Sequence, residues 1–501
     1  MRRESGILMP IFSLPSEYGI GDFGRSSYNF IDFLKRANQR VWQILPLVQT
    51  GYGNSPYSSI CSTSLNPYFI SVENLLKEGL IDSQDLVEIK NNSRYVDYEF
   101  LYNTRFSLLR KAFSRFDKQD EGFKKFTKNK GFLDYAIFMA KKTLTNHKPF
   151  YEWEKGLKTR DKKAIIEFVN TNKEEVLFWQ FIQYRARSEW QGVKKYANKN
   201  KVKILGDMPL YVALDSVDVW CNPKLFKIDK RFKPKKVAGV PPDYFSQDGQ
   251  LWGNPVYNYK EHKKDNFKWW TNRIKQTLKN VDLLRIDHFR ALDRFYQIDY
   301  GKKTAREGQW VKVPSRSLID AIHSKVDAKK IIAEDLGIID DGVRKLLKYT
   351  NYPGMKILSF AFNGEDTNPY LPKNIEENSV CFTGTHDNDT LLGLIEGLSA
   401  WDKNNLYWGV KNSLKDLNVQ GQTDSNEMLL ESIIKLCFAV KSKLVIIPMQ
   451  DIMQRNSQYR INKPGELKQE NWAIRFFEGE YGEREINTLL TLNNQYNRNK
   501  N

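Results

Sequence analysis

Eight short apolar runs, most of them ending in polar or acidic residues, constrain the fold of this chain more than any other feature. In order they are SGILMPI (5–11), VWQILPL (41–47), VKILGDMPL (202–210), VDLLRID (281–287), KIIAEDLG (330–337), MKILSFAF (355–362), SVCFTGTHD (379–387) and KLVIIPMQD (443–451). Their nearly continuous hydrophobicity is typical of strands that are buried on both faces, as in parallel sheets. Helical patterns such as SSYNFIDFLKRA and RSLIDAIHSKV lie between most of them. Eight strands alternating with helices predict an α/β fold, the (β/α)8 TIM barrel.

Two intervals between the predicted strands are too long for simple crossovers. Residues 71–200 contain several amphipathic helical patterns, and residues 212–280 begin as a loop rich in Pro, Gly and aromatic residues and end in a helix. Insertions after barrel strands lie on the face where the βα loops build the active site. No Gly/Ser-rich or Pro-rich linker divides the chain. We therefore expect one catalytic barrel over 1–501, with a helical insertion at 71–200 and a loop-rich insertion at 212–280 over the active site.

Composition and charge exclude several classes of protein. The net charge of +18 comes from single lysines and arginines mixed with acidic residues, without a basic block or a nucleic-acid-binding motif, so it indicates a solvated surface and no nucleic-acid partner. No apolar stretch approaches membrane-spanning length, and the N-terminal residues lack a signal-peptide pattern. The four cysteines form no C-x-x-C pair, which predicts neither zinc nor a disulfide framework and favours a cytoplasmic location.

The segment GIGDFG (19–24) matches the dinucleotide-binding pattern G-x-G-x-x-G. Its context argues against a nucleotide, because SLPSE separates it from the preceding strand and the second strand ends without a ribose-binding acid. A glycine-rich first barrel loop is the better interpretation. No calcium-loop pattern is present either, so we expect no cofactor and no metal.

Polar residues at the ends of four predicted strands are the candidates for catalysis. They are Asp207, Arg285 with Asp287, Glu334 with Asp335, and His386 with Asp387. In a barrel, side chains at the carboxyl ends of the strands converge on one face.

Residues i and i+2 of a strand share a face, so Arg285 should hold Asp287 ionised by depressing its pKa. An ionised carboxylate of this kind suits a nucleophile. A nearby carboxyl with a raised pKa could donate a proton, and either Glu334 or Asp335 fits, since only one of them can face inward. Two such carboxyls about 5 Å apart would cleave a glycosidic bond with retention of configuration.

Each of these features also has a structural explanation. An Arg-x-Asp pair at a sheet end is more often an ion pair, a Glu-Asp step is often a cap, and Thr-His-Asp can form a turn. The catalytic interpretation rests on their shared position at the ends of different strands on one side of the barrel.

Eight strings in this sequence resemble the amylomaltases, which are 4-α-glucanotransferases (disproportionating enzymes) related to the α-amylase clan. They are SGILMPIFSLPSEYGIGDFG, GNSPYSS, GDMPLYVALDSVDVW, GVPPDYFSQDGQLWGNPVY, LLRIDHFR, IIAEDLG, YPGMKIL and TGTHDNDT, which occur in the family's order between about Ser5 and Arg475. The resemblance implies a transferase that moves segments of α-1,4-glucan from a maltodextrin donor to glucose or a maltodextrin acceptor.

The resemblance also implies roles for individual residues. Asp287 matches the family's nucleophile, Glu334, not Asp335, its general acid/base, and Asp387 the third carboxylate that binds hydroxyls of the reacting glucose. Further substrate-binding positions are implied for Arg285, His386, Asp207, Tyr57, Tyr244, Gln250, Trp252 and Asn462. Among these, Tyr57 matches the aromatic platform under the reacting sugar, and Tyr244, Gln250 and Trp252 lie in a loop that closes over the glucan in the family.

Three positions depart from the family pattern: Ala291 and Ser315, where Gly is usual, and residues 452–454. None is a catalytic carboxyl, so these positions bear on loop shape and chain-length preference.

Three rival hypotheses for the function are a hydrolytic α-amylase, a nicotinamide oxidoreductase and an inactive glucan-binding protein. The sequence lacks the dinucleotide-binding features that an oxidoreductase would need. An inactive glucan-binding protein should have lost a catalytic carboxyl, and all three are present. We expect a monomer or weak homodimer.

Overall fold

The eight predicted strands form one parallel sheet in the computed structural model, which describes residues 3–51, 53–242, 247–466 and 468–500. The spatial order is β10 (Gly354–Ile357), β11 (Ser379–Phe382), β12 (Leu444–Pro448), β1 (Glu4–Leu8), β2 (Val41–Gln43), β3 (Lys203–Met208), β6 (Leu283–Ile286) and β9 (Ile331–Ala333). Each predicted run overlaps one of these strands. Between the outer strands β9 and β10, the Ala333 amide donates to the Pro353 carbonyl at 2.9 Å. The (β/α)8 barrel prediction is therefore confirmed.

Continuous hydrophobic runs form these strands because both faces of the sheet are buried. Ile7 of β1 is fully buried and lies in register with Trp42 of β2 on one side and Ile447 of β12 on the other. Gly6 allows the close approach of β1 and β2, since a Cβ at that position would lie 2.2 Å from the Val41 carbonyl oxygen. The strands thus depend on packing from all sides.

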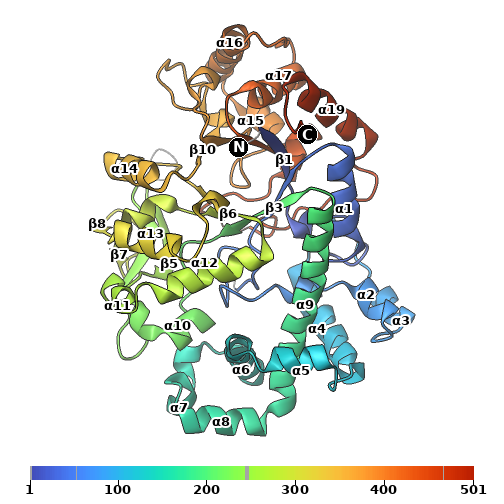
Figure 1. Cartoon of the computed structure of the whole chain (residues 1–501), viewed down its shortest axis with the longest axis vertical. Coiled ribbons are helices and arrows are strands. Elements are labelled where there is room, and N and C mark those ends of the chain that lie inside the picture. The colour runs from blue at the N-terminus through green and yellow to red at the C-terminus, as the bar shows by residue number, and fades with distance from the viewer. Residues whose placement is uncertain (1–2, 52, 243–246, 467, 501) are drawn as a thin grey trace.

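Helices surround the barrel, and a group of them projects from one end of the molecule (Figure 1). The helices that follow or precede barrel strands are α1 (Arg25–Arg36), α9 (Lys173–Lys199), α12 (Lys268–Asn280), α13 (Ser315–His323), α14 (Asp341–Thr350), α15 (Leu391–Gly397), α16 (Ala400–Asp416), α17 (Asn426–Ala439), α18 (Met449–Ile452) and α19 (Glu483–Gln495). Residues 358–378, between β10 and β11, form only short 3-10 turns and no α-helix. No helix among the described residues is long and apolar enough to cross a membrane.

The interval 71–200 is helical in the structure. Its helices before α9 are α2 (Val72–Lys77), α3 (Ser83–Glu88), α4 (Tyr98–Arg115), α5 (Glu121–Thr127), α6 (Lys130–Leu144), α7 (Lys155–Lys158) and α8 (Lys162–Thr171). The long helix α9 connects this group to the barrel. Its Trp190 is fully buried and donates through Nε1 to the Asn280 carbonyl at the end of α12.

The interval 212–280 contains strands that the sequence analysis did not predict. After α10 (Val217–Cys221), β4 (Lys236–Val240) and β5 (Gln250–Pro255) form an antiparallel pair, followed by α11 (Tyr259–Lys264) and α12. They join β7 (Arg294–Asp299) and β8 (Gly308–Lys312) in a four-stranded sheet of order β5-β4-β7-β8. The residues between β6 and α13 are therefore a third excursion from the barrel. These strands lack a long apolar run because much of β5 and β8 faces solvent.

Candidate active site

The polar residues at the strand ends converge as predicted. Asp207 lies in β3 and Arg285 in β6, while Asp287 and Glu334 directly follow β6 and β9. Adjacent strands fix their positions, because the Asp287 amide donates to the Met208 carbonyl and the Glu334 amide donates to the Ile286 carbonyl, both at 3.1 Å.

Arg285 lies at the centre of a buried charge cluster. Its Nη1 donates to Asp207 Oδ2 at 2.5 Å and to Asp287 Oδ1 at 3.1 Å. The side chains of Arg285 and Asp207 are almost fully buried, whereas 26% of the Asp287 side chain is exposed. One cation therefore orients two carboxylates, of which only Asp287 reaches solvent to an appreciable degree.

Arg285 lowers the pKa of Asp287 as predicted, but the expected net depression of that pKa is wrong. Burial raises the pKa of Asp287 to about 6, with Asp207 and Asp387 adding to the rise, and Arg285 opposes this shift without reversing it. The sequence pattern shows the pairing of Arg285 with Asp287 but not the depth of the site or the nearby acids. Asp287 nevertheless remains mostly ionised at neutral pH.

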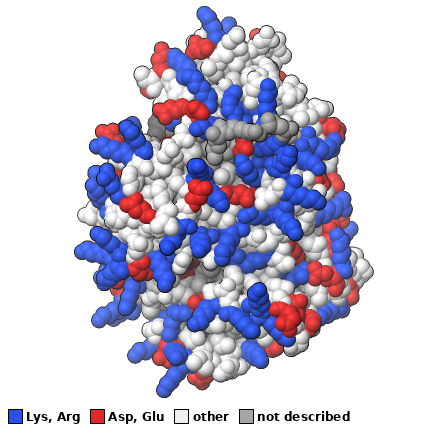
Figure 2. Space-filling view, viewed as in Figure 1, with Lys and Arg blue, Asp and Glu red and all other residues white. Residues whose placement is uncertain are grey.

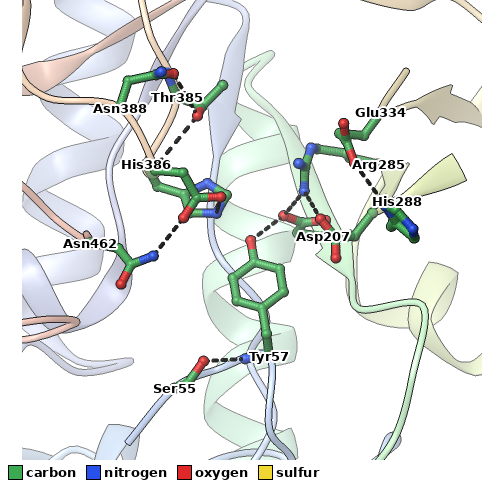
Figure 3. Close-up of polar contacts among 12 residues, drawn as sticks. Ser55, Tyr57, Asp207, Arg285, His288, Glu334, Thr385, His386, Asn388 and Asn462 are labelled. Carbon is green, nitrogen blue, oxygen red and sulfur yellow. Dashed lines mark hydrogen bonds and ion pairs between the residues drawn. The ribbon is translucent and has the colours of Figure 1, made fainter. Parts of the chain in front are cut away.

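Glu334 and Asp335, which alternation alone could not distinguish, point to different partners. Asp335 Oδ1 accepts a hydrogen bond from the Met355 amide at 2.6 Å, so it ties β9 to β10. Glu334 instead turns toward the loop after β6, where one carboxylate oxygen accepts a hydrogen bond from the His288 amide at 2.6 Å. The other oxygen accepts a hydrogen bond at 2.8 Å from the amide of Leu336, two residues later in the same loop as Glu334. Figure 3 shows Glu334 beside Arg285 and His288.

Burial raises the pKa of Glu334 to about 8. The charge of Asp287 adds to the rise, while Arg285 and the two backbone amides oppose it. The surroundings of the two groups therefore favour a protonated Glu334 beside an ionised Asp287.

Asp387 is held from two sides. The Asn462 side-chain amide donates to its Oδ1 at 2.6 Å, and His386 Nε2 lies 3.3 Å from its Oδ2. Desolvation would raise the pKa of Asp387, but His386 and the hydrogen bond from Asn462 lower it to about 2. With 42% of its side chain exposed, Asp387 presents a fixed negative charge to solvent.

Tyr57 connects the two halves of the site. Its hydroxyl donates to Asp207 Oδ2 at 2.6 Å (Figure 3), and its ring stacks on the His386 ring with the centroids 5.2 Å apart and the planes 13° apart. Burial, together with the charge of Asp207, raises the pKa of this phenol well above its usual range. Tyr57 therefore stays neutral and donates a hydrogen bond to Asp207.

The loop-rich insertion contacts the site through Trp252. This indole is 37% exposed, donates from Nε1 to Gln250 Oε1 at 3.1 Å, and packs edge-to-face on the His288 ring with the centroids 4.9 Å apart. Tyr244, which was predicted to bind substrate from the same loop, lies outside the described residues. His288 has a left-handed backbone conformation (φ 49°) that directs its amide to Glu334.

Two residues at the site were missed by the sequence analysis. Trp472 packs against Tyr57, with the ring centroids 5.5 Å apart, and Arg460 Nη2 donates to the Asp387 carbonyl at 2.7 Å. Both lie in the segment after the last barrel strand, where only Asn462 was singled out. The polar and aromatic strings RINKPG and NWAIRF in that segment were the available signal.

A metal site is not evident in the part of the chain that the structure describes. No group of three or more His, Cys, Asp or Glu side chains there is arranged to hold a metal ion. The carboxylates of the site are bound to Arg285, Asn462 and backbone amides instead.

Comparisons with known proteins agree with this geometry. The 4-alpha-glucanotransferase family profile matches residues 9–478. A 4-alpha-glucanotransferase of Clostridium butyricum is 42% identical over 98% of this chain and all of that enzyme, and one of Aquifex aeolicus is 40% identical over 92% and 93%. The solved amylomaltase of Streptococcus agalactiae in complex with acarbose superposes with a TM-score of 0.93 at 36% identity, covering 99% of this chain and all of the other. The chain therefore belongs to the 4-alpha-glucanotransferase family.

Proposed function

We propose that this site transfers segments of α-1,4-glucan by a retaining double displacement, with Asp287 as nucleophile, Glu334 as general acid/base and Asp387 binding the reacting glucose. The observation that carries this assignment is the different setting of the two carboxyls: Asp287 binds the Arg285 guanidinium at 3.1 Å, whereas Glu334 is buried against backbone amides. Burial and the charge of Asp287 raise the pKa of Glu334, so Glu334 can donate a proton while Asp287 attacks as a carboxylate.

In the first displacement, Asp287 attacks the anomeric carbon of a bound glucan as the bond to the leaving oxygen breaks. Glu334 donates its proton to that oxygen, so the leaving chain departs with a free 4-hydroxyl and a covalent glycosyl-enzyme remains. In the second displacement, ionised Glu334 removes the proton from the 4-hydroxyl of an acceptor, which attacks the same carbon and releases Asp287. Two inversions preserve the α configuration.

The neighbouring residues position these groups. Arg285 orients Asp287 and is itself held by Asp207. Asp207 in turn accepts a hydrogen bond from the Tyr57 hydroxyl. We assign to Tyr57 the platform under the reacting sugar and to Asp387, fixed by Asn462, the binding of hydroxyls whose hydrogen bonds strengthen in the transition state.

Transfer requires an acceptor sugar to compete successfully with water at the glycosyl-enzyme. We propose that the 212–280 insertion covers the site for this purpose, with Gln250, Trp252 and Tyr244 against the glucan, and that the 71–200 helices form a flanking subdomain. The contact of Trp252 with His288, next to Asp287, supports the first of these roles.

We further propose that the enzyme acts in the cytoplasm as a monomer or weak homodimer on soluble maltodextrins. The four cysteines are free thiols, which suits a reducing compartment. Light scattering on the purified protein tests the oligomeric state, and fractionation of the source cells tests the location.

Incubation with maltotriose alone tests the proposed reaction. Glucose together with a ladder of oligosaccharides longer than maltotriose is the expected result, because transfer must lengthen one chain when it shortens another. Glucose and maltose with nothing longer would instead mean that water attacks the intermediate and that the enzyme is a hydrolase.

A further inference from the structure

Helix α16 exposes two tryptophans that no part of the proposed mechanism uses. Trp401 is 69% exposed, more than any other large hydrophobic side chain among the described residues, and Trp408 is 49% exposed. The opposite face of the helix supplies its packing, through buried Leu406, Val410 and Leu414. Core packing therefore does not explain the tryptophans. Figure 1 places α16 at the end of the molecule opposite the group of helices α4–α8.

The two indoles belong to one uncharged stripe. Residues 401, 405, 408 and 412 recur at the helical spacing i, i+4, i+7 and i+11, so they share a face. Asn405 and Asn412 lie in this stripe beside the tryptophans, and neither side-chain amide bonds to another described residue. On the visible face in Figure 2, lysine and arginine side chains are spread among acidic and uncharged residues, in keeping with the net charge of +18.

The Trp408 ring is held in place. The Tyr407 ring meets it edge-to-face, with the centroids 5.3 Å apart and the planes at 86°, and Lys411 Nζ lies 4.9 Å from its centroid. Trp408 follows Trp401 by seven positions, which sets the two residues about 10 Å apart along the helix axis. An ordered ring at a fixed spacing from a second ring is a surface for an extended ligand with repeating flat faces.

We propose that this stripe, formed by Trp401, Asn405, Trp408 and Asn412, is a non-catalytic binding site for the enzyme's own α-1,4-glucan. The apolar faces of successive glucose residues can stack on the indoles, and the free amides can donate to and accept from their hydroxyl groups. A glucan is an uncharged polyhydroxyl chain and needs no counter-charge from the stripe, and Lys411 beside the Trp408 ring is a further donor to its hydroxyl groups.

The location of α16 suits a site that serves long chains. The helix follows α15, which begins directly after the loop that contains Asp387, and its Gly409 packs on Phe362 beyond the end of β10. The stripe is therefore attached to loops from the carboxyl ends of two barrel strands. We expect a glucan long enough to reach both the stripe and the catalytic carboxyls to be held at a raised local concentration, and a short oligosaccharide to gain nothing from the stripe.

The test compares Trp401→Ala/Trp408→Ala with wild type in a binding assay and in a kinetic assay. Only the kinetic assay rests on the proposed function. In native gels containing glycogen, we expect the wild type to be retarded and the double variant to lose most of that retardation. In kinetics, we expect the KM for long amylose to rise about tenfold, with maltotriose turnover unchanged. Tyr349→Ala, which removes another exposed aromatic from α14, is the matched control and should behave as wild type.

Several results would overturn the proposal. Unchanged retardation and unchanged KM for amylose would show that the stripe does not bind glucan. An equal loss on amylose and maltotriose would indicate a structural effect, which Trp401→Tyr/Trp408→Tyr checks because it keeps both rings. A shift from dimer to monomer in the double alanine variant would identify a second copy of the chain as the occupant.

Discussion

The separation of the two carboxyl pKa values should respond selectively to removal of one neighbouring charge. Asp207 Oδ2 and Asp287 Oδ1 both bind Arg285 Nη1, at 2.5 and 3.1 Å, so these oxygens are at most about 5.6 Å apart. At that separation, with an effective dielectric constant of about 20, two unit charges repel by about 3 kcal/mol, equivalent to about 2 pKa units. Exposure of part of the Asp287 side chain to water reduces this to an expected shift of about 1 to 2 units.

The sign of the shift follows from the charges. Asp207→Asn removes an anion that disfavours ionised Asp287 and leaves Arg285 to interact with Asp287 more strongly, so both effects lower the pKa of Asp287 from about 6. The rise in the pKa of Glu334 has burial and Asp287 as its causes, so it should stay at about 8.

The assay is kcat/KM for maltotriose disproportionation as a function of pH, which reports the titrations of the free enzyme. We expect wild type to show a bell with limbs near pH 6 and pH 8 that belong to the coupled pair. In Asp207→Asn the acidic limb should move down by about 1 to 2 units and the alkaline limb should stay, while the maximum falls. Asp134→Asn, which breaks a partly exposed pair with Arg160 in the 71–200 interval, is the control and should move neither limb. An acidic limb that stays or moves up would refute this electrostatic reasoning.

Substitutions at three further residues test the supporting contacts. Tyr57→Phe keeps the ring but loses the hydrogen bond to Asp207, so kcat/KM for maltotriose should fall about tenfold, and Tyr57→Ala should cost more because the platform is lost too. Asn462→Ala removes the 2.6 Å hydrogen bond to Asp387 and should lower kcat about tenfold or more, with an unchanged circular dichroism spectrum. Arg475→Met should lower the free energy of unfolding in urea by about 3 kcal/mol, because buried Arg475 donates to carbonyls of three residues in the first loop and the segment before α4.

Each of these expectations has a result that contradicts it. Equal activities of Tyr57→Phe and Tyr57→Ala would show that the ring is no platform. Wild-type turnover in Asn462→Ala would mean that Asp387 needs no support from the C-terminal segment. An unchanged urea midpoint for Arg475→Met, with Arg25→Met as an exposed control, would mean that the buried carbonyls find other donors.

The barrel and most of its catalytic face could be predicted because they depend on local patterns. Runs such as LVIIP in β12 are buried on both faces and therefore remain apolar throughout, and polar residues mark where each run ends. The choice between Glu334 and Asp335 did not follow from alternation. It depends on the turn after β6, where the left-handed His288 supplies the amide that binds Glu334.

The features that escaped prediction depend on contacts between distant segments. Strand β4 pairs with β7, more than fifty residues later in the chain, and neither strand has a run that distinguishes it from a loop. Trp472 and Arg460 reach the site from the C-terminal segment, and the net rise in the pKa of Asp287 reflects burial by the whole assembly of loops. The thiols of Cys381 and Cys437, far apart in sequence, lie 3.5 Å apart in the structure for the same reason.

Trapping the glycosyl-enzyme is the measurement that tests the central assignment most directly. In Glu334→Gln, a maltosyl fluoride donor still has a leaving group that needs no proton, whereas the second displacement lacks its base, so the covalent intermediate should accumulate. The account predicts an intact mass raised by one maltosyl group, carried by the peptide that contains Asp287, and no such adduct in Glu334→Gln/Asp287→Asn. An adduct on another residue, or glucan transfer by a folded Asp287→Asn variant at the wild-type rate, would contradict it.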